Sequence, residues 1–121
     1  STSYDELKNL VNSEAKKLKI KTVFFHSNIE GEIVNYIQNL INDKNSWIVI
    51  NPGAYTHTSI AIRDALQIYA QNNKIVEVHI SDINQREQFR KTNLISDICN
   101  KSIVGRGVQG YIEALEYINE Q

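Results

Sequence analysis

Short apolar runs alternate with longer amphipathic stretches along this chain, and the alternation is what most constrains its fold. Runs rich in β-branched and aromatic residues predict strands at 21–25, 47–50, 75–80 and 101–104. Apolar residues at helical spacing predict helices before the first run, between the runs and at the end of the chain. Strands that alternate with helices form a parallel sheet with helices on both faces. We therefore expect an α/β fold, and the flavodoxin-like three-layer sandwich is the simplest topology.

Polar residues before the helical stretches indicate where the helices begin. Ser3 or Asp5 can cap a first helix that ends near Leu18, and the spacing of Ser27 and Glu30 is that of a capping box for the second. Further helices are predicted at 60–70, at 86–90 and from Val108 to the end, with short helix and turn at 91–100.

The chain opens with a helix, whereas flavodoxin-like domains open with a strand. In the strand order 2-1-3-4-5 the first strand lies inside the sheet. Without it, the predicted strands at 21–25 and 47–50 would flank an empty slot and leave backbone groups unpaired, which is costly when they are buried. We therefore expect either a segment upstream of Ser1 or another element in this slot.

Composition excludes several classes of function. A length of 121 residues predicts one domain, 1–121, and a net charge of −1 gives no basic surface for nucleic acid or membrane. No apolar run approaches the roughly 20 residues of a membrane span. The single cysteine, Cys99, cannot form an internal disulfide. We expect it to pack as a small buried residue in a cytoplasmic protein.

Residues 51–59, with the sequence NPGAYTHTS, join a predicted strand to a predicted helix. Ligands of parallel α/β sheets bind at the carboxyl ends of strands, so this junction is a candidate site. His57 lies at the start of the helix, where the dipole disfavours a positive charge. It is a candidate proton donor or relay. Alternatively, neighbouring hydroxyl groups satisfy its ring.

His79 lies near the end of the next predicted strand and shares a strand face with Glu77, two residues earlier. A carboxylate in that position can fix the tautomer of an imidazole; the alternative is a buried polar pair with no further role. Arg86 and Arg90 share a helix face after the same strand, and with Ser81 they could bind an anion or form a solvated basic face. His26 is interpreted as structural.

Other motifs are weaker. The histidines have no metal-ligand spacing and the chain has no cysteine pair, so no metal site is expected. Residues 105–110 match G-x-G-x-x-G in letters, but too little sequence follows for the acidic residue that binds a ribose. We interpret these glycines as serving a turn and close helix packing.

Taken together, these residues resemble the type II dehydroquinases, or 3-dehydroquinate dehydratases. The resemblance covers essentially the whole chain, in order and with the family's spacing. It is carried by residues 27–32 (SNIEGE), 51–59 (NPGAYTHTS), 63–65 (RDA), 76–81 (VEVHIS), 86–90 (REQFR) and 105–111 (GRGVQGY).

The resemblance implies a flavodoxin-like enzyme that removes water from 3-dehydroquinate by anti elimination through an enolate, giving 3-dehydroshikimate in the shikimate pathway without metal or organic cofactor. It makes His57 the general acid, and Asn51 a substrate-binding residue that helps to hold His57. It places the substrate carboxylate on the backbone of Ile80 and Ser81 and on the Ser81 hydroxyl. The remaining implied substrate contacts are His79 and Arg90 at the ring hydroxyls, and Asp64, which reaches the site of a neighbouring subunit.

The family assembles as trimers, usually four of them in a dodecamer. Its first strand and a mobile lid, which carries an arginine and the tyrosine base, precede the residues matched here. Both the topology and the resemblance therefore lead us to expect a further segment of roughly 20–25 residues before Ser1. The alternatives are a catalytically inactive flavodoxin-like binding paralogue that begins at Ser1 and a flavin- or phosphate-binding module.

Overall fold

The computed structural model describes residues 2–82 and 92–121. Its helices are α1 (Tyr4–Leu18), α2 (Glu30–Leu40), α3 (Ile60–Tyr69) and α4 (Gln109–Asn119). Its strands are β1 (Trp47–Ile50), β2 (Lys74–His79) and β3 (Lys101–Val104), and the described residues also form the short 3-10 helices η1 (Gly53–His57) and η4 (Ser96–Ile98).

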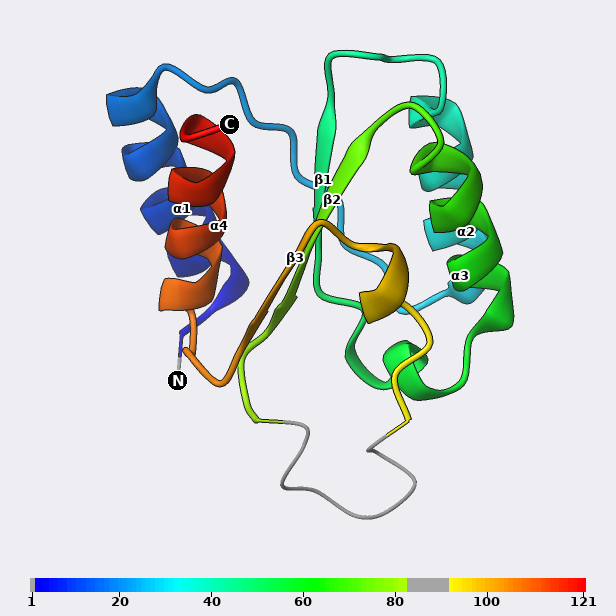
Figure 1. Ribbon diagram of the computed structural model, residues 1–121. Helices are drawn as coiled ribbons and strands as arrows, with labels where there is room; N and C mark the ends of the chain where they lie inside the picture. Colours follow the sequence, from blue (N-terminus) through cyan, green and yellow to red (C-terminus); the bar gives the residue numbers. More distant parts are fainter. Residues whose placement is uncertain (1, 83–91) are drawn as a thin grey trace.

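The strands form a parallel sheet in the order β1-β2-β3. Helices α1 and α4 lie on one side of it, and α2 and α3 lie on the other (Figure 1). This arrangement confirms the predicted α/β fold with a parallel sheet between two helical layers. β1 pairs with β2 alone among the described strands.

The central strand, β2, organises the core, because every residue after Lys74 is buried. Ile75 packs with Leu66 and Tyr69 of α3, whereas Val76 and Val78 pack with helix α4 on the other face. Burying one such side chain contributes about 1.5–3 kcal/mol. The two-residue period of the strand also turns Glu77 and His79 toward the α3 side, the face that carries Ile75.

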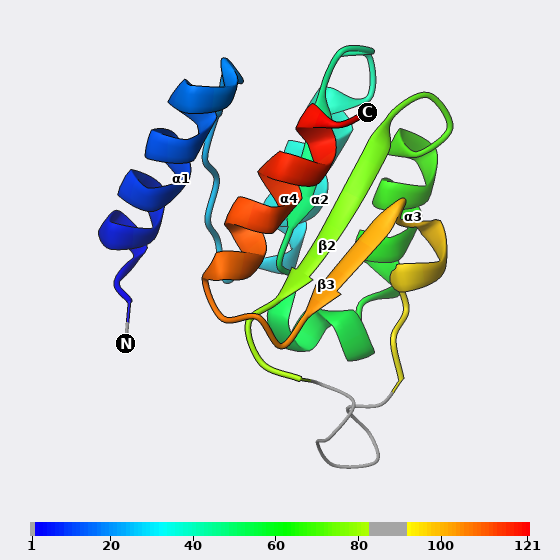
Figure 2. The same cartoon turned by 60° about the vertical axis from the view of Figure 1, so that its left-hand side comes forward.

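Helix α1 is the outermost element of its layer and packs on α4 (Figure 2). Its N-cap is Ser3, whose hydroxyl accepts from the backbone of Glu6 while the Glu6 side chain accepts from the Ser3 backbone. The structure thus selects Ser3 over Asp5. Val11 and Ala15 bury the apolar stripe of α1 against Leu115.

The predicted strand at 21–25 is wrong. These residues have no regular secondary structure, and the side chain of Val23 is 74% exposed. A run of β-formers becomes a strand only when a neighbouring strand pairs with its backbone, and none of the described strands does so. Phe25 instead stacks on Tyr36 of α2, with 4.2 Å between the ring centroids.

The predicted capping box at Ser27 and Glu30 is also wrong. Helix α2 begins at Glu30 with Ile29 in the cap position and no side-chain cap. The Ser27 hydroxyl accepts from the Ile29 backbone and donates to Glu32, while the Glu30 carboxylate accepts from Ser59 at the start of α3. The glutamate therefore joins two helices instead of closing its own.

The strands predicted at 47–50 and 101–104 are confirmed as β1 and β3, and the other predicted elements within the described residues differ only at their ends. The strand predicted at 75–80 is Lys74–His79, and the helix predicted at 60–70 is Ile60–Tyr69. The short helix predicted at 86–90 lies outside the described residues. The 91–100 stretch contains η4, as its irregular pattern indicated.

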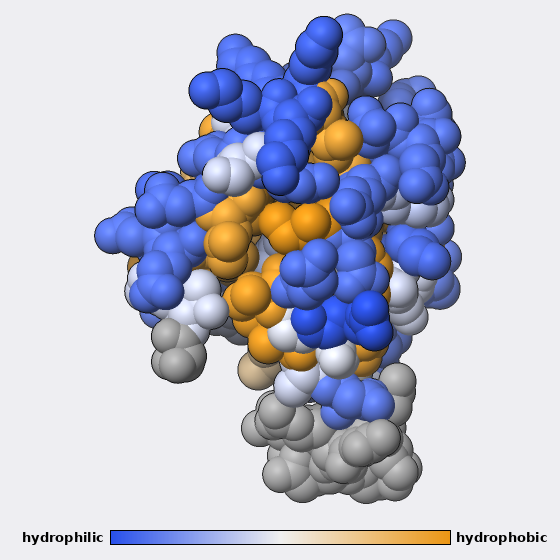
Figure 3. All heavy atoms as spheres, turned by 90° about the vertical axis from the view of Figure 1, so that its left-hand side faces the viewer, coloured by the Kyte–Doolittle hydropathy of each residue, from blue (hydrophilic) through white to orange (hydrophobic). Residues whose placement is uncertain are grey.

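The surface over α1 and α4 carries a patch of apolar side chains in the midst of polar ones (Figure 3). Within residues 2–82 and 92–121, no helix combines the length and the apolar character that crossing a membrane requires.

Candidate active site

The carboxyl ends of the three strands meet at one edge of the sheet, the lower edge in Figure 1. Asn51 follows β1, His79 ends β2 and Gly105 follows β3. The loop after β3 is fastened to the end of β2, because Gly105 N donates to the His79 carbonyl at 3.0 Å and Gly107 N to the Ile80 carbonyl at 2.9 Å. These two hydrogen bonds therefore brace the loop after β3 against the end of β2 at this edge.

His57 is half-buried and is the last residue of η1, so it does not lie in the first turn of α3 as the predicted position at a helix start implied. Its Nδ1 lies 2.6 Å from the carbonyl oxygen of Thr92. A carbonyl can only accept, so Nδ1 carries the proton and donates it. The neutral ring then presents an unprotonated Nε2, which accepts hydrogen bonds. Just beyond it, Ser59 caps α3 by accepting from Ile62 N.

Glu77 and His79 form a buried pair, 0% and 3% exposed. His79 Nε2 lies 2.6 Å from Glu77 Oε2. The carboxylate accepts from Nε2–H, which leaves Nδ1 as the remaining ring nitrogen. The predicted sharing of one strand face is confirmed, and the structure adds the direct hydrogen bond that fixes the ring.

The Glu77 carboxylate is held in its charged form. Burial alone raises its pKa, but hydrogen bonds from His79, Ser102 and Asn93 outweigh that effect and hold the pKa below its ordinary value. Ser102 donates to Oε1, and Asn93 donates to Oε2 at 2.7 Å. A buried carboxylate with three donors is a fixed negative charge beside His79.

Asn51 is held by neighbours other than His57. Its amide nitrogen donates to the Tyr111 hydroxyl at 3.0 Å, and its amide oxygen accepts from Gly53 N at 3.1 Å. Burial raises the pKa of Tyr111, an effect that the hydrogen bond from Asn51 partly offsets. The described residues show no hydrogen bond between Asn51 and His57, although Asn51 was expected to help to hold that ring. The carbonyl of Thr92 orients His57 instead.

The structure adds a segment that sequence reasoning missed, residues 92–97. Thr92 accepts from His57, and Asn93 donates to Glu77. Arg63 fastens the segment to α3 through the Leu94 carbonyl and the carboxylate of Asp97, each at 2.6 Å. The only local signal was Asn93 itself, a residue type whose side chain accepts from backbone nitrogens two or three positions further on.

The other predicted residues lie as follows. Ile80 and Ser81 come directly after β2 and are exposed, and Asp64 is exposed on α3. Arg90 and Arg86 lie outside the described residues. His26 lies in the segment between α1 and α2, and its ring packs against that of Tyr4 in α1. Cys99 is half-buried, and burial together with Glu77 and Asp97 raises the pKa of its thiol to about 12, so it remains an uncharged packing residue.

The glycines at 105–110 serve the turn and the packing, as interpreted. Gly105 and Gly107 have φ values of 75° and 58°, in the left-handed region that glycine adopts without strain. A Cβ on Gly110 would lie 3.1 Å from a methyl group of Val78. The third glycine therefore lets α4 approach the sheet closely.

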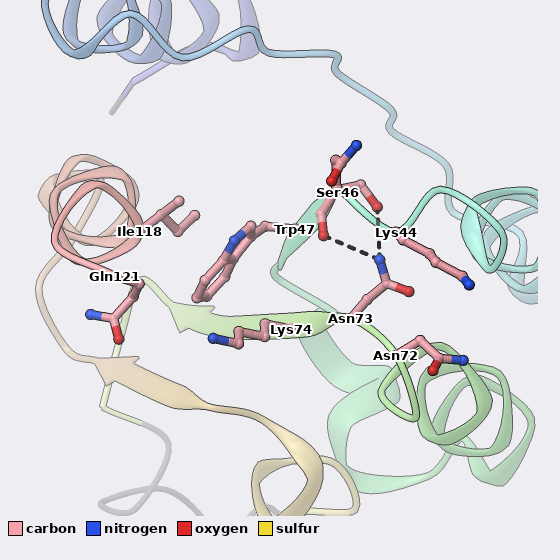
Figure 4. A pocket seen from close by; sticks show the side chains of 9 residues that line it. Lys44, Ser46, Trp47, Asn72, Asn73, Lys74, Ile118 and Gln121 are labelled. Atoms are coloured by element: carbon pink, nitrogen blue, oxygen red, sulfur yellow. Dashed lines mark hydrogen bonds between the residues drawn. The ribbon is translucent and has the colours of Figure 1, made fainter.

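A hollow of about 330 Å³ lies at the opposite edge of the sheet, where β1 and β2 begin (Figure 4). Trp47, Asn73 and Lys74 line it, and the described residues around it include no histidine, aspartate or glutamate. Ligand sites of parallel sheets lie at the carboxyl ends of strands. The hollow is therefore separate from the candidate active site.

Comparison with known proteins agrees with this geometry. The family model of class II dehydroquinase matches residues 1–119. The chain is 44% identical to the 3-dehydroquinate dehydratase of Caldicellulosiruptor saccharolyticus over 120 residues, which cover 99% of this chain and 81% of that protein. It is 46% identical over 120 residues to the 3-dehydroquinate dehydratase of Fusobacterium nucleatum, covering 98% and 80%.

Solved structures give the same answer. The type II dehydroquinase of Butyrivibrio crossotus superposes with a TM-score of 0.91 at 44% identity, covering 97% of this chain and 80% of that one. The type II dehydroquinase of Propionibacterium acnes superposes with a TM-score of 0.93 at 31% identity, covering 99% and 81%. Sequence match, strand order and the histidines at the carboxyl edge thus agree, and the chain belongs to the class II dehydroquinase family.

Proposed function

We propose that this protein is a 3-dehydroquinate dehydratase, a hydro-lyase that eliminates water from 3-dehydroquinate to give 3-dehydroshikimate in the shikimate pathway. Membership of the family supports the substrate, because relatives of the same family bear that name. The observation that carries the chemistry is the buried Glu77–His79 pair at the edge that also holds His57. By the family resemblance, the reaction passes through an enolate and needs no metal or organic cofactor.

Two histidines compete for the role of the acid that protonates the departing hydroxyl. The resemblance assigned that role to His57. When neutral, however, His57 offers an acceptor at Nε2, because its proton is donated from Nδ1 to Thr92. It can donate from Nε2 only when the ring is charged, and its Nδ1 faces the Thr92 carbonyl instead of a carboxylate that would stabilise the charge.

His79 has the support that His57 lacks. The Glu77 carboxylate accepts from Nε2 and stabilises an imidazolium, whose Nδ1–H is then a proton donor. This contrast favours His79 as the acid and His57 as a ligand of a substrate oxygen. The assignment of His57 as the acid stays a prediction, and the same experiment tests both.

Substrate binding would use the rest of the edge. We propose that the backbone at Ile80 and Ser81, with the Ser81 hydroxyl, binds the substrate carboxylate, and that Asn51 and Arg90 bind ring oxygens. Asn51 is supported by its fixed amide, which Tyr111 and Gly53 orient. An Arg90→Ala variant should raise KM for 3-dehydroquinate, and an unchanged KM would remove Arg90 from the site.

The test is a dehydratase assay on the full-length protein. The assay follows the ultraviolet absorbance of the conjugated enone in 3-dehydroshikimate. Replacing the acid with alanine should lower kcat by about 10²–10⁴-fold. Replacing a residue that only binds substrate should act mainly on KM. We expect the first result for His79→Ala and the second for His57→Ala; the reverse result would return the acid role to His57. Wild-type protein that binds 3-dehydroquinate without turnover would instead establish the inactive binding paralogue.

We further propose that the enzyme is a homo-oligomer, a trimer assembled four times into a dodecamer. Ile60, Asp64 and Ile68 recur every four residues on α3 and therefore share one face. The two isoleucines are 65% and 47% exposed, which is unfavourable in water and suits a subunit contact. Asp64 between them would then reach a neighbour's site.

Light scattering coupled to size-exclusion chromatography tests this assembly. Ile60→Glu should reduce the mass from that of an oligomer, because it places a charge in the contact. Gln67→Glu adds the same charge at an exposed position of α3 and serves as the matched control. An unchanged mass for Ile60→Glu would exclude this face. Because Cys99 is the only cysteine, we also propose a cytoplasmic location.

A further inference from the structure

Asn93 is fixed at both ends of its amide group. Its Nδ2 donates to Glu77 Oε2 at 2.7 Å, the same oxygen that accepts from His79. Its Oδ1 accepts from the backbone nitrogens of Ile95 and Ser96, both at 2.9 Å. The side chain therefore has one orientation, in which the N–H group must face the carboxylate.

The segment that carries Asn93 also holds the second histidine. The carbonyl of Thr92 accepts from His57 Nδ1, and Leu94 N donates to the Thr56 carbonyl at 2.9 Å. One turn of chain thus touches η1 at one residue and the buried carboxylate at the next. A displacement of this turn would move the Thr92 carbonyl that holds His57 and also the Asn93 donor that holds Glu77, the partner of His79.

We propose that Asn93 is a positioning residue for the reaction: it locks Glu77 against His79 and holds the turn whose Thr92 carbonyl orients His57. The inference rests on the proposed function. Asn93 would contact no reacting atom and would act only through Glu77 and the turn. Geometric errors of about 1 Å at a reacting group can cost about 100-fold in rate, so an element that sets both histidines matters for kcat.

A carboxylate held only by His79 could rotate about its terminal bond. Ser102 fixes Oε1 from β3, and Asn93 fixes Oε2 from the 92–97 turn. Together they define the plane of the carboxylate and hence the direction in which His79 is held. Asn93 differs from Ser102 in one respect, because only Asn93 also belongs to the turn that reaches His57.

The isosteric variant Asn93→Asp separates positioning from packing. It keeps the oxygen that accepts from the backbone nitrogens of Ile95 and Ser96. It replaces the N–H donor by a second carboxylate oxygen facing Glu77. Two carboxylates this close share a proton with a raised pKa. When the pair holds that proton, the Asp O–H restores the donor; when it does not, the two charges repel and Glu77 is displaced.

The expected result is a pH-dependent loss. Relative to wild type, kcat of Asn93→Asp should be lower by about tenfold or more at about pH 8.5 and should recover as the pH falls toward about 5.5, with KM within about threefold. The other titratable groups near Glu77 do not produce the same pH dependence. His79, the titratable group in direct contact with Glu77, is present in both proteins, so the loss is taken as a ratio to wild type. Burial raises the pKa of the Cys99 thiol to about 12, Asp97 is paired with Arg63, and the register partner of Glu77 on β1 is the apolar Ile50.

Nuclear magnetic resonance of the imidazoles gives a readout that does not depend on turnover. The signals of the His79 ring should differ between wild type and Asn93→Asp at high pH and converge at low pH, while those of His26 stay unchanged. If wild-type protein does not dehydrate 3-dehydroquinate, the proposed function fails, but these signals still decide whether Asn93 positions His79. A kcat ratio near one at all pH values, or unchanged His79 signals, would overturn the proposal.

Two further variants complete the experiment. Asp97→Ala loosens the same turn at its Arg63 anchor without touching Glu77, so its effect should be independent of pH. Asn93→Ser retains an oxygen for the backbone nitrogens of Ile95 and Ser96 but is too short to reach Glu77. It replaces Asn93→Asp in the test if that variant does not fold. It should lower kcat by about tenfold at every pH, and wild-type activity of Asn93→Ser would refute the role of Asn93.

Discussion

The 2.6 Å hydrogen bond between His79 Nε2 and Glu77 Oε2 joins two buried side chains at the carboxyl end of the central strand. Removing the charge while keeping the shape tests what this bond does. Glu77→Gln should lower kcat by about 10²-fold with little change in KM, because a neutral amide stabilises an imidazolium poorly. The steady-state dehydratase assay measures both parameters.

Ser102→Ala is the matched control for Glu77→Gln. It removes one hydrogen bond to the same carboxylate but leaves the charge and the His79 contact in place. We expect a smaller loss of kcat than for Glu77→Gln. Equal losses in the two variants would show that packing around Glu77, not its charge, supports the reaction.

Glu77 should also make the free energy of unfolding depend on pH. Its folded-state pKa lies below the ordinary value, so the charged carboxylate stabilises the fold above the unfolded-state pKa of about 4.3. That contribution should disappear as the pH falls through the lower, folded-state pKa. Urea denaturation of wild type and Glu77→Gln at pH 7 and at acid pH measures it: the difference in unfolding free energy should shrink in acid. A constant difference would contradict the pKa shift.

The period-two pattern of the central strand was sufficient to place Glu77 and His79 on one face, because strand alternation is a local rule. The same kind of local rule failed at residues 21–25. Val23 and Phe25 have high strand propensity, but a strand also needs a paired neighbour, which no local pattern reveals.

The partners of the histidines could not be found from the sequence for a related reason. Thr92 lies 35 residues from His57, and Asn93 lies 16 residues from Glu77. Their stretch of chain has no clear periodicity, and only the folded backbone brings it to the sheet edge. The position of His57 in the junction between β1 and α3 was predictable; the tautomer imposed by Thr92 was not.

The core on the α3 side predicts how strongly single residues support the fold. Leu66 and Ile68 lie two positions apart on α3 but are 0% and 47% exposed. Leu66→Ala should lower the free energy of unfolding by about 2–5 kcal/mol, because it removes buried methyl groups and leaves a cavity. Ile68→Ala should cost much less when unfolding is followed at low protein concentration. Similar losses would contradict the packing of this helix.

The hydrogen bond from Asn51 to Tyr111 ties the candidate substrate-binding amide to helix α4. Tyr111→Phe should raise KM for 3-dehydroquinate severalfold with kcat nearly unchanged, because Asn51 would lose one of the two contacts that orient it. The cost of losing one such hydrogen bond is about 0.5–1.5 kcal/mol. Tyr117→Phe, on the same helix, removes a hydroxyl that faces the Asn100 carbonyl and is the control; its KM should equal that of wild type. An unchanged KM for Tyr111→Phe, or an equal rise in both variants, would show that Asn51 does not depend on Tyr111 for its orientation.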